Sequence, residues 1–75
     1  MEKKMMIDTV RSIFLARHIN AQEIADVLGV TKWVAQDRLR NPERFDAEEL
    51  ALLTKHTALT AGDVAQIVSA VAEAR

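Results

Sequence analysis

The segment 31–44 groups side chains that donate or accept hydrogen bonds at helical spacing. At about 100° per residue, Ala35 and Leu39 share one side of a helix, and a polar and aromatic set falls on the opposite side. That set is Trp33, Gln36, Asp37 and Arg40, with Lys32 at the N-terminal edge. Glutamine can pair with adenine, arginine with guanine and aspartate with cytosine, while lysine can neutralise phosphate. The outward side of this segment therefore has the chemistry to contact nucleic-acid bases.

The charge of the whole chain argues against that chemistry, but its distribution does not. The formal net charge is −1, whereas strong nucleic-acid binders usually carry a basic excess. Residues 31–44 hold four basic and two acidic groups, a local excess of +2, and residues 45–75 hold two basic and five acidic groups. The segment 31–44 is therefore the one locally basic part of the chain.

The elements that position these side chains are predicted to be helices. The 75 residues contain two glycines, one proline and no β-type alternation, so we expect a single all-α domain over residues 1–75. Helices are predicted at about 3–18, 21–28, 32–40, 47–56 and 61–74. His18 is expected in the last turn of the first helix, where it suits the negative end of the helix dipole.

Three of the predicted helix starts share one capping pattern. A capping residue is followed three positions later by an acidic residue, and an apolar pair can staple across the start. The capping pairs are Asn20 with Glu23, Asp46 with Glu49, and Thr60 with Asp63; the staples are Ile19 with Ile24, Phe45 with Leu50, and Leu59 with Val64. Because the pattern occurs three times, these are the best-defined boundaries of the chain.

The connection between the second and third helices meets the demands of a helix-turn-helix. A small residue is needed where the two helices cross, and Ala25 provides it. Gly29 can adopt the positive φ of the turn, Val30 can fill the corner and Thr31 can cap the following helix.

The stretch "IADVLGVTKWVAQDRLRNPERFDAEEL" resembles the Cro and phage-repressor (XRE-like) type of helix-turn-helix domain. The resemblance covers about residues 10–60 and implies a lambda-repressor-like five-helix fold. It also implies a bacterial or phage transcription regulator that binds double-stranded DNA as a homodimer, with helix 32–40 in the major groove. The positions that match DNA-facing places of the family are Thr31, Lys32, Trp33, Gln36 and Arg40; Asn41 and Arg44 match its phosphate-contacting loop.

Three positions depart from the family pattern. Ala21 stands where a glutamine is common, with Gln22 one residue later. Ala35 is smaller than the usual buried residue, so we expect Val34 or Trp33 to fill the space beside it. Trp33 therefore either fills this space or faces the groove of the DNA. Asp37 either reads a base or repels the DNA.

The last predicted helix carries an apolar stripe with two interpretations. Its residues are Val64, Ile67, Val68 and Val71. They form either part of the core or the dimer face, and one helix can serve both.

The sequence also disfavours several other classes of function. It has no nucleophile–base set, no glycine-rich phosphate loop and no cysteine, so we expect no enzyme, cofactor, metal site or small-molecule substrate. The absence of a long apolar run predicts a soluble cytoplasmic protein without a membrane segment. The alternative function is a helical protein-interaction module, antitoxin-like or a phage accessory factor, that keeps this fold without reading DNA.

Overall fold

Five α-helices and one short 3₁₀ turn form the computed structural model, which describes residues 1–75. The elements are α1 (Lys3–Ala16), α2 (Ala21–Leu28), α3 (Lys32–Arg40), the 3₁₀ turn η1 (Pro42–Arg44), α4 (Ala47–His56) and α5 (Ala61–Ala74). The chain contains no strand, so the predicted all-α class is confirmed. No helix combines the length and the apolar character needed to cross a membrane.

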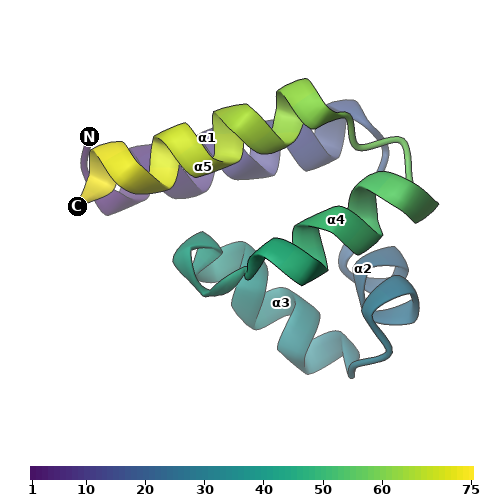
Figure 1. Ribbon diagram of the computed structural model, residues 1–75. Helices are drawn as coiled ribbons and strands as arrows, with labels where there is room; N and C mark the ends of the chain where they lie inside the picture. Colours follow the sequence, from purple (N-terminus) through teal and green to yellow (C-terminus); the bar gives the residue numbers. More distant parts are fainter.

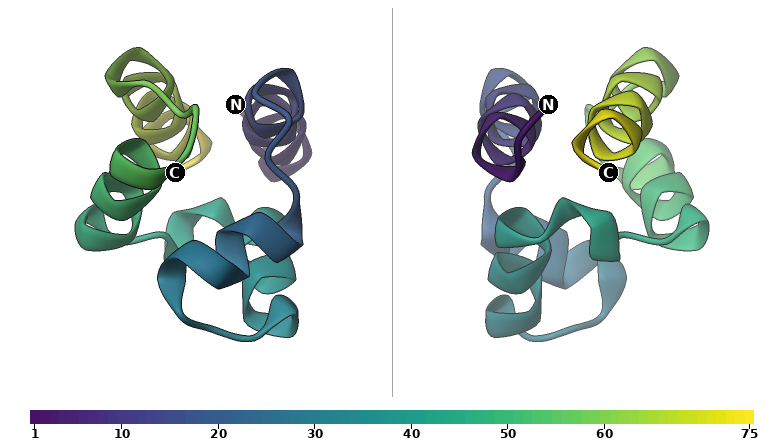
Figure 2. Two further views of the ribbon diagram at one scale, coloured as in Figure 1. Left: turned by 90° about the vertical axis from the view of Figure 1, so that its right-hand side faces the viewer. Right: turned by 90° about the vertical axis from the view of Figure 1, so that its left-hand side faces the viewer.

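The helices form two groups that α4 connects (Figure 1). The helices α1 and α5 pack side by side in opposite directions, and the amino group of Met1 donates to the carbonyl oxygen of Glu73 at 2.9 Å. The pair α2 and α3 lies on the other side of the molecule, and the turn that joins them is the part most distant from α1 and α5 (Figures 1 and 2). The start of α3 therefore lies at an outer tip of the protein.

One apolar core holds both groups together. Phe14 of α1 and Phe45, which follows η1, stack with ring centroids 5.9 Å apart. The core consists of Val10, Phe14, Ile19, Ile24, Ala25, Ala35, Phe45, Leu50, Leu53, Leu59 and Ile67. Every element except η1 contributes to this cluster or flanks it, so α3 is held by the same core that packs α1 against α5.

The predicted caps are present at the starts of α2, α4 and α5. Asp46 and Glu49 exchange side-chain and backbone hydrogen bonds of 2.8 and 3.0 Å, as a capping box requires. Thr60 and Asp63 form a second complete box at 3.0 Å in both directions. At α2 only half of the box forms, because Asn20 accepts from the amide of Glu23 at 2.9 Å without the reciprocal bond.

The end of α1 differs from the sequence prediction. The helix ends at Ala16, and His18 lies beyond it with φ 58°, in the left-handed region. The amide of His18 donates to the carbonyl of Leu15 at 3.0 Å, and that of Ile19 donates to the carbonyl of Phe14 at 2.9 Å. This is a Schellman motif, and Phe14 and Ile19 both belong to the apolar core. The expectation that His18 occupies the last helical turn is therefore wrong.

Candidate nucleic-acid interface

The turn between α2 and α3 has the local geometry that the sequence predicts. Gly29 adopts φ 67° and ψ 34°, the left-handed conformation that glycine adopts without a Cβ clash. Thr31 caps α3 by accepting from the amide of Val34 at 3.2 Å. Ala25 is buried, as a close crossing of α2 and α3 requires. These three residues set the direction in which α3 leaves the turn.

Trp33 lies on the outer side of α3, with 71% of its surface exposed. It does not fill the space beside Ala35, which is itself fully buried in the core. Of the two interpretations of Trp33, the core role is therefore wrong. An exposed tryptophan on a short polar helix leaves a large apolar ring without a partner from α1 or α4.

Arg40 is associated with that ring. Its guanidinium carbon lies over the indole of Trp33, 5.6 Å from the ring centroid, within the range of a cation–π contact. Gln36 lies between them on the same stripe of α3, because positions i, i+3 and i+7 share one side of a helix. The side-chain hydrogen bonds formed by α3 involve only Asp37 and Arg38, so the amide of Gln36 has no partner within the chain.

Asp37 does not point freely outward, as the helical spacing suggested. Its carboxylate accepts from Nη1 of Arg44 at 2.9 and 3.0 Å and from Nδ2 of the Asn41 side chain at 3.1 Å. Arg38 donates to it at 3.3 Å. The hydrogen bond from Arg44 is the main cause that lowers the pKa of Asp37 below its ordinary value, against the effect of burial. Asp37 therefore acts within the protein as the centre of an ion-pair network.

The residues expected to contact phosphate, Asn41 and Arg44, take part in the same network. Asn41 accepts from Nζ of Lys3 at 2.8 Å, and Lys3 lies 3.4 Å from Glu43. Arg44 is paired with Asp37, as described above. These contacts connect the start of α1 to the end of α3 and to η1. In this structure, Asn41 and Arg44 are therefore held by partners within the chain.

The local basic excess is consequently smaller in the folded protein than in the sequence. Arg38 of α3 pairs with Glu49 at 3.4 Å and with Asp37 at 3.3 Å. The five ion pairs of the chain include neither Lys32 nor Arg40. These two cations of α3 are available to an external anion without breaking an internal pair.

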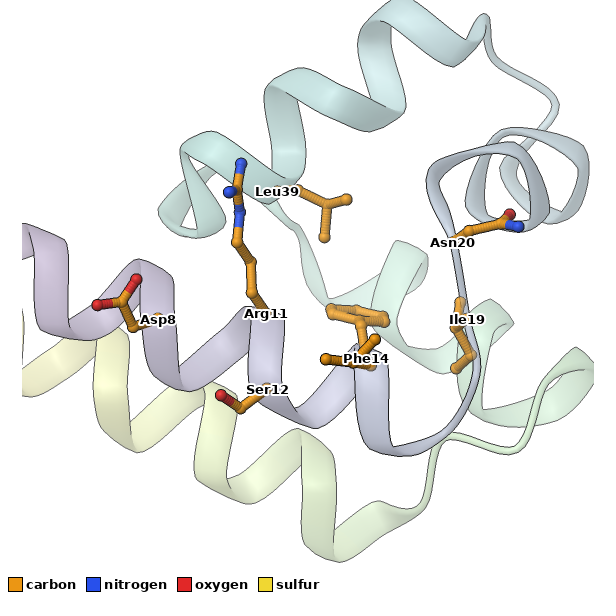
Figure 3. A pocket seen from close by; sticks show the side chains of 8 residues that line it. Asp8, Arg11, Ser12, Phe14, Ile19, Asn20 and Leu39 are labelled. Atoms are coloured by element: carbon orange, nitrogen blue, oxygen red, sulfur yellow. The ribbon is translucent and has the colours of Figure 1, made fainter.

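Arg11 is a further free cation near α3 that the sequence did not single out. It rises from α1 beside Leu39 and toward the end of α3, in a groove between the two helices (Figure 3). It takes part in none of the five ion pairs. No sequence pattern relates Arg11 to α3, because the two helices come together only through the packing of the core.

The apolar stripe of α5 is divided between core and surface. Ile67 is 1% exposed and belongs to the core, so it cannot form part of an exposed face. Val64 and Val71 are half-buried, whereas Val68 is 54% exposed. Two apolar hollows meet at Val68. One is lined by residues of α4 and α5 that include Ala51 and Lys55, and the other extends past Val71 to Pro42, Glu43 and Arg75.

Comparisons with known proteins add no family to these observations. No protein-family model matches the chain, and neither a curated protein nor a solved structure matches it. No three histidine, cysteine, aspartate or glutamate side chains come together in a way that could hold a metal ion.

Proposed function

We propose that the protein is a sequence-specific DNA-binding regulator of transcription, of bacterial or phage type. In this proposal α2 and α3 form a helix-turn-helix within a lambda-repressor-like arrangement, and α3 enters the major groove. The observation that carries the proposal is the stripe of Trp33, Gln36 and Arg40. It lies on an outer helix, and neither the amide of Gln36 nor the charge of Arg40 has a polar partner within the chain.

The chemistry of each side chain gives it a different task in that complex. Gln36 can bind the N6 and N7 edge of adenine, and Arg40 can bind O6 and N7 of guanine. Thr31 and Lys32 lie at the N-terminus of α3, where the helix dipole also favours a phosphate. Asn41 and Arg44 contact phosphate only if they exchange their bonds to Asp37 for bonds to the DNA.

Binding as a homodimer would compensate for the small number of free cations. Two linked subunits place two reading helices on two half-sites, and the second contact is made at high effective concentration. Val68 is the centre of the proposed dimer face, with the half-buried Val64 and Val71 beside it. A dimer on an operator would then repress transcription by blocking access of the polymerase.

Selection of bound sequences from a random duplex pool tests this function. We expect the wild type to enrich a two-fold-related site, and Gln36→Ala and Arg40→Ala to lose discrimination between sites while their circular dichroism stays unchanged. The matched control is Gln66→Ala, since Gln66 is an exposed glutamine on α5. If both α3 variants select the wild-type site with wild-type affinity, α3 is not the reading helix.

A protein-interaction module is the second candidate, and one observation favours it. Leu15 is 77% exposed and lines the groove between α1 and α3. Phe14 and Leu39 line the same groove (Figure 3). An exposed apolar residue beside an apolar groove is typical of a surface that binds a protein segment. The salt dependence of binding to random duplex DNA separates the two functions. A clear negative slope of log K against log salt indicates phosphate contacts, whereas no binding at about 50 mM salt supports the interaction module.

A further inference from the structure

The contact between Trp33 and Arg40 restricts what α3 can recognise. The two residues are seven positions apart, but the guanidinium of Arg40 turns back toward the N-terminus and lies over the indole of Trp33. A guanidinium over an aromatic ring is favoured in that position by the cation–π contact and keeps its N–H edge available for hydrogen bonds. The ring and the guanidinium therefore act as one surface rather than as two independent side chains.

Their separation keeps both groups within reach of neighbouring base pairs. Consecutive bases of one strand are about 3.4 Å apart along the helix axis, and the guanidinium lies 5.6 Å from the ring centroid, less than two such steps. Guanine offers the two acceptors that a guanidinium can bind, and the C5-methyl group is the one apolar feature of the major groove. An exposed indole beside a guanidinium is thus complementary to a methylated pyrimidine next to a guanine.

We propose that Trp33 and Arg40 form a single reading unit for a thymine adjacent to a guanine. Trp33 packs on the thymine methyl group and Arg40 donates two hydrogen bonds to the guanine. The inference rests on the proposed function, because it requires that α3 lies in the major groove. It further implies that 5-methylcytosine, which carries the same methyl group, substitutes for the thymine better than cytosine does.

Replacing thymine by uracil tests the contact of Trp33 directly, because it removes only the methyl group. On the site selected from the random pool, we expect this replacement to weaken binding of the wild type about fourfold, the effect of losing one buried methyl group. Trp33→Ala removes this sensitivity. Replacing cytosine by 5-methylcytosine at the same position strengthens binding of the wild type but not of Trp33→Ala.

The variant Arg40→Lys tests the other half of the unit, because lysine keeps the charge but lacks the planar fork. We expect it to reduce the preference for guanine about 5- to 100-fold while the salt dependence stays unchanged. If Arg40→Lys prefers guanine as strongly as the wild type does, the proposal is overturned, and Arg40 contacts phosphate instead of a base. Both residues are largely exposed, so the fold, checked by circular dichroism, is expected to persist in both variants.

The outcomes separate this inference from the proposed function. If the wild type selects a site that depends on Gln36, but uracil binds as well as thymine at every position, the reading unit is wrong and the DNA-binding function stands. If the wild type binds no duplex DNA, both are wrong. If replacing thymine by uracil lowers the affinity of Trp33→Ala as much as that of the wild type, another group contacts the methyl group. The reading unit is then overturned.

Discussion

Arg17 and Asp63, 46 residues apart in the sequence, form a two-point ion pair that joins the end of α1 to the start of α5. Nε and Nη2 of Arg17 donate to the two carboxylate oxygens of Asp63 at 2.7 and 3.1 Å. The same carboxylate accepts from the amide of Thr60 at 3.0 Å, and Asp63 is only 7% exposed. One carboxylate therefore caps α5 and anchors it to α1.

The variant Asp63→Asn is expected to destabilise the protein by removing this anchor. It deprives Arg17 of its counter-charge and weakens the cap on α5, and loss of one partner leaves the other group poorly satisfied. We expect the Tm to fall by several degrees at neutral pH, measured by circular dichroism. Asp8→Asn is the control for the change of charge, because Asp8 is exposed and forms none of the five ion pairs. Equal Tm values for the two variants would contradict an anchoring role.

Acid should reduce stability in a defined range through the same residue. The hydrogen bond from Arg17 is the main cause that lowers the pKa of Asp63 from 3.8 to about 2. As the pH falls below 3.8, the unfolded chain takes up a proton at Asp63 before the folded protein does, so the stabilisation is lost between about pH 4 and pH 2. Urea unfolding across this range should show the difference between wild type and Asp63→Asn shrinking as the pH falls. A difference that stays constant down to pH 2 would exclude this role of Asp63.

The left-handed conformation of His18 predicts a stabilising substitution. Residues with a Cβ are strained at φ 58°, whereas glycine is not. Because the side chain of His18 is exposed, His18→Gly should raise the free energy of unfolding by about 0.5–1 kcal/mol. The gain can be measured by urea denaturation at neutral pH. His18→Ala keeps the Cβ and should show no comparable gain; equal gains in both variants would contradict the strain explanation.

The parts of the fold that sequence predicted well are those set by neighbouring residues. Caps such as Asp46 with Glu49, and the left-handed turn at Gly29, depend on side chains within a few positions of the backbone that they satisfy. The end of α1 was missed because a histidine occupies the left-handed position where glycine is the usual signal.

The candidate site was less predictable because its charges are arranged by tertiary packing. Helical spacing placed Asp37 outward, but η1 brings Arg44 back to it, and α4 brings Glu49 to Arg38. The exposure of Trp33 likewise depends on how the core accommodates Ala35, which no local pattern encodes. Sequence could therefore identify the residues of α3 but not which of them remain free to bind.

The exposed position of Val68 predicts the effect of a charge on the proposed dimer. A two-fold interface contains each residue twice, so Val68→Glu places two like charges at its centre. We expect the dissociation constant of the dimer, measured by sedimentation equilibrium, to rise at least tenfold, with the fold unchanged. Gln66→Glu adds the same charge at an exposed position on the opposite side of α5 and should leave the dimer intact. A dimer of Val68→Glu as stable as the wild type would place the interface elsewhere.

The pairing of Asp37 with Arg44 predicts that Asp37 limits the affinity for DNA. In the proposed complex, Arg44 contacts phosphate only after leaving a carboxylate to which it donates at 2.9 and 3.0 Å. Asp37→Asn keeps the shape of the side chain, removes the competing charge and should leave Arg44 available to the DNA. We expect binding at low salt to become several-fold tighter, with a slope of log K against log salt steeper by up to about one unit. Glu73→Gln makes the same change of net charge at an exposed position of α5. It should change the affinity and the slope against salt much less than Asp37→Asn does. If the two variants gain equally, the effect is one of net charge, and Asp37 does not restrain Arg44.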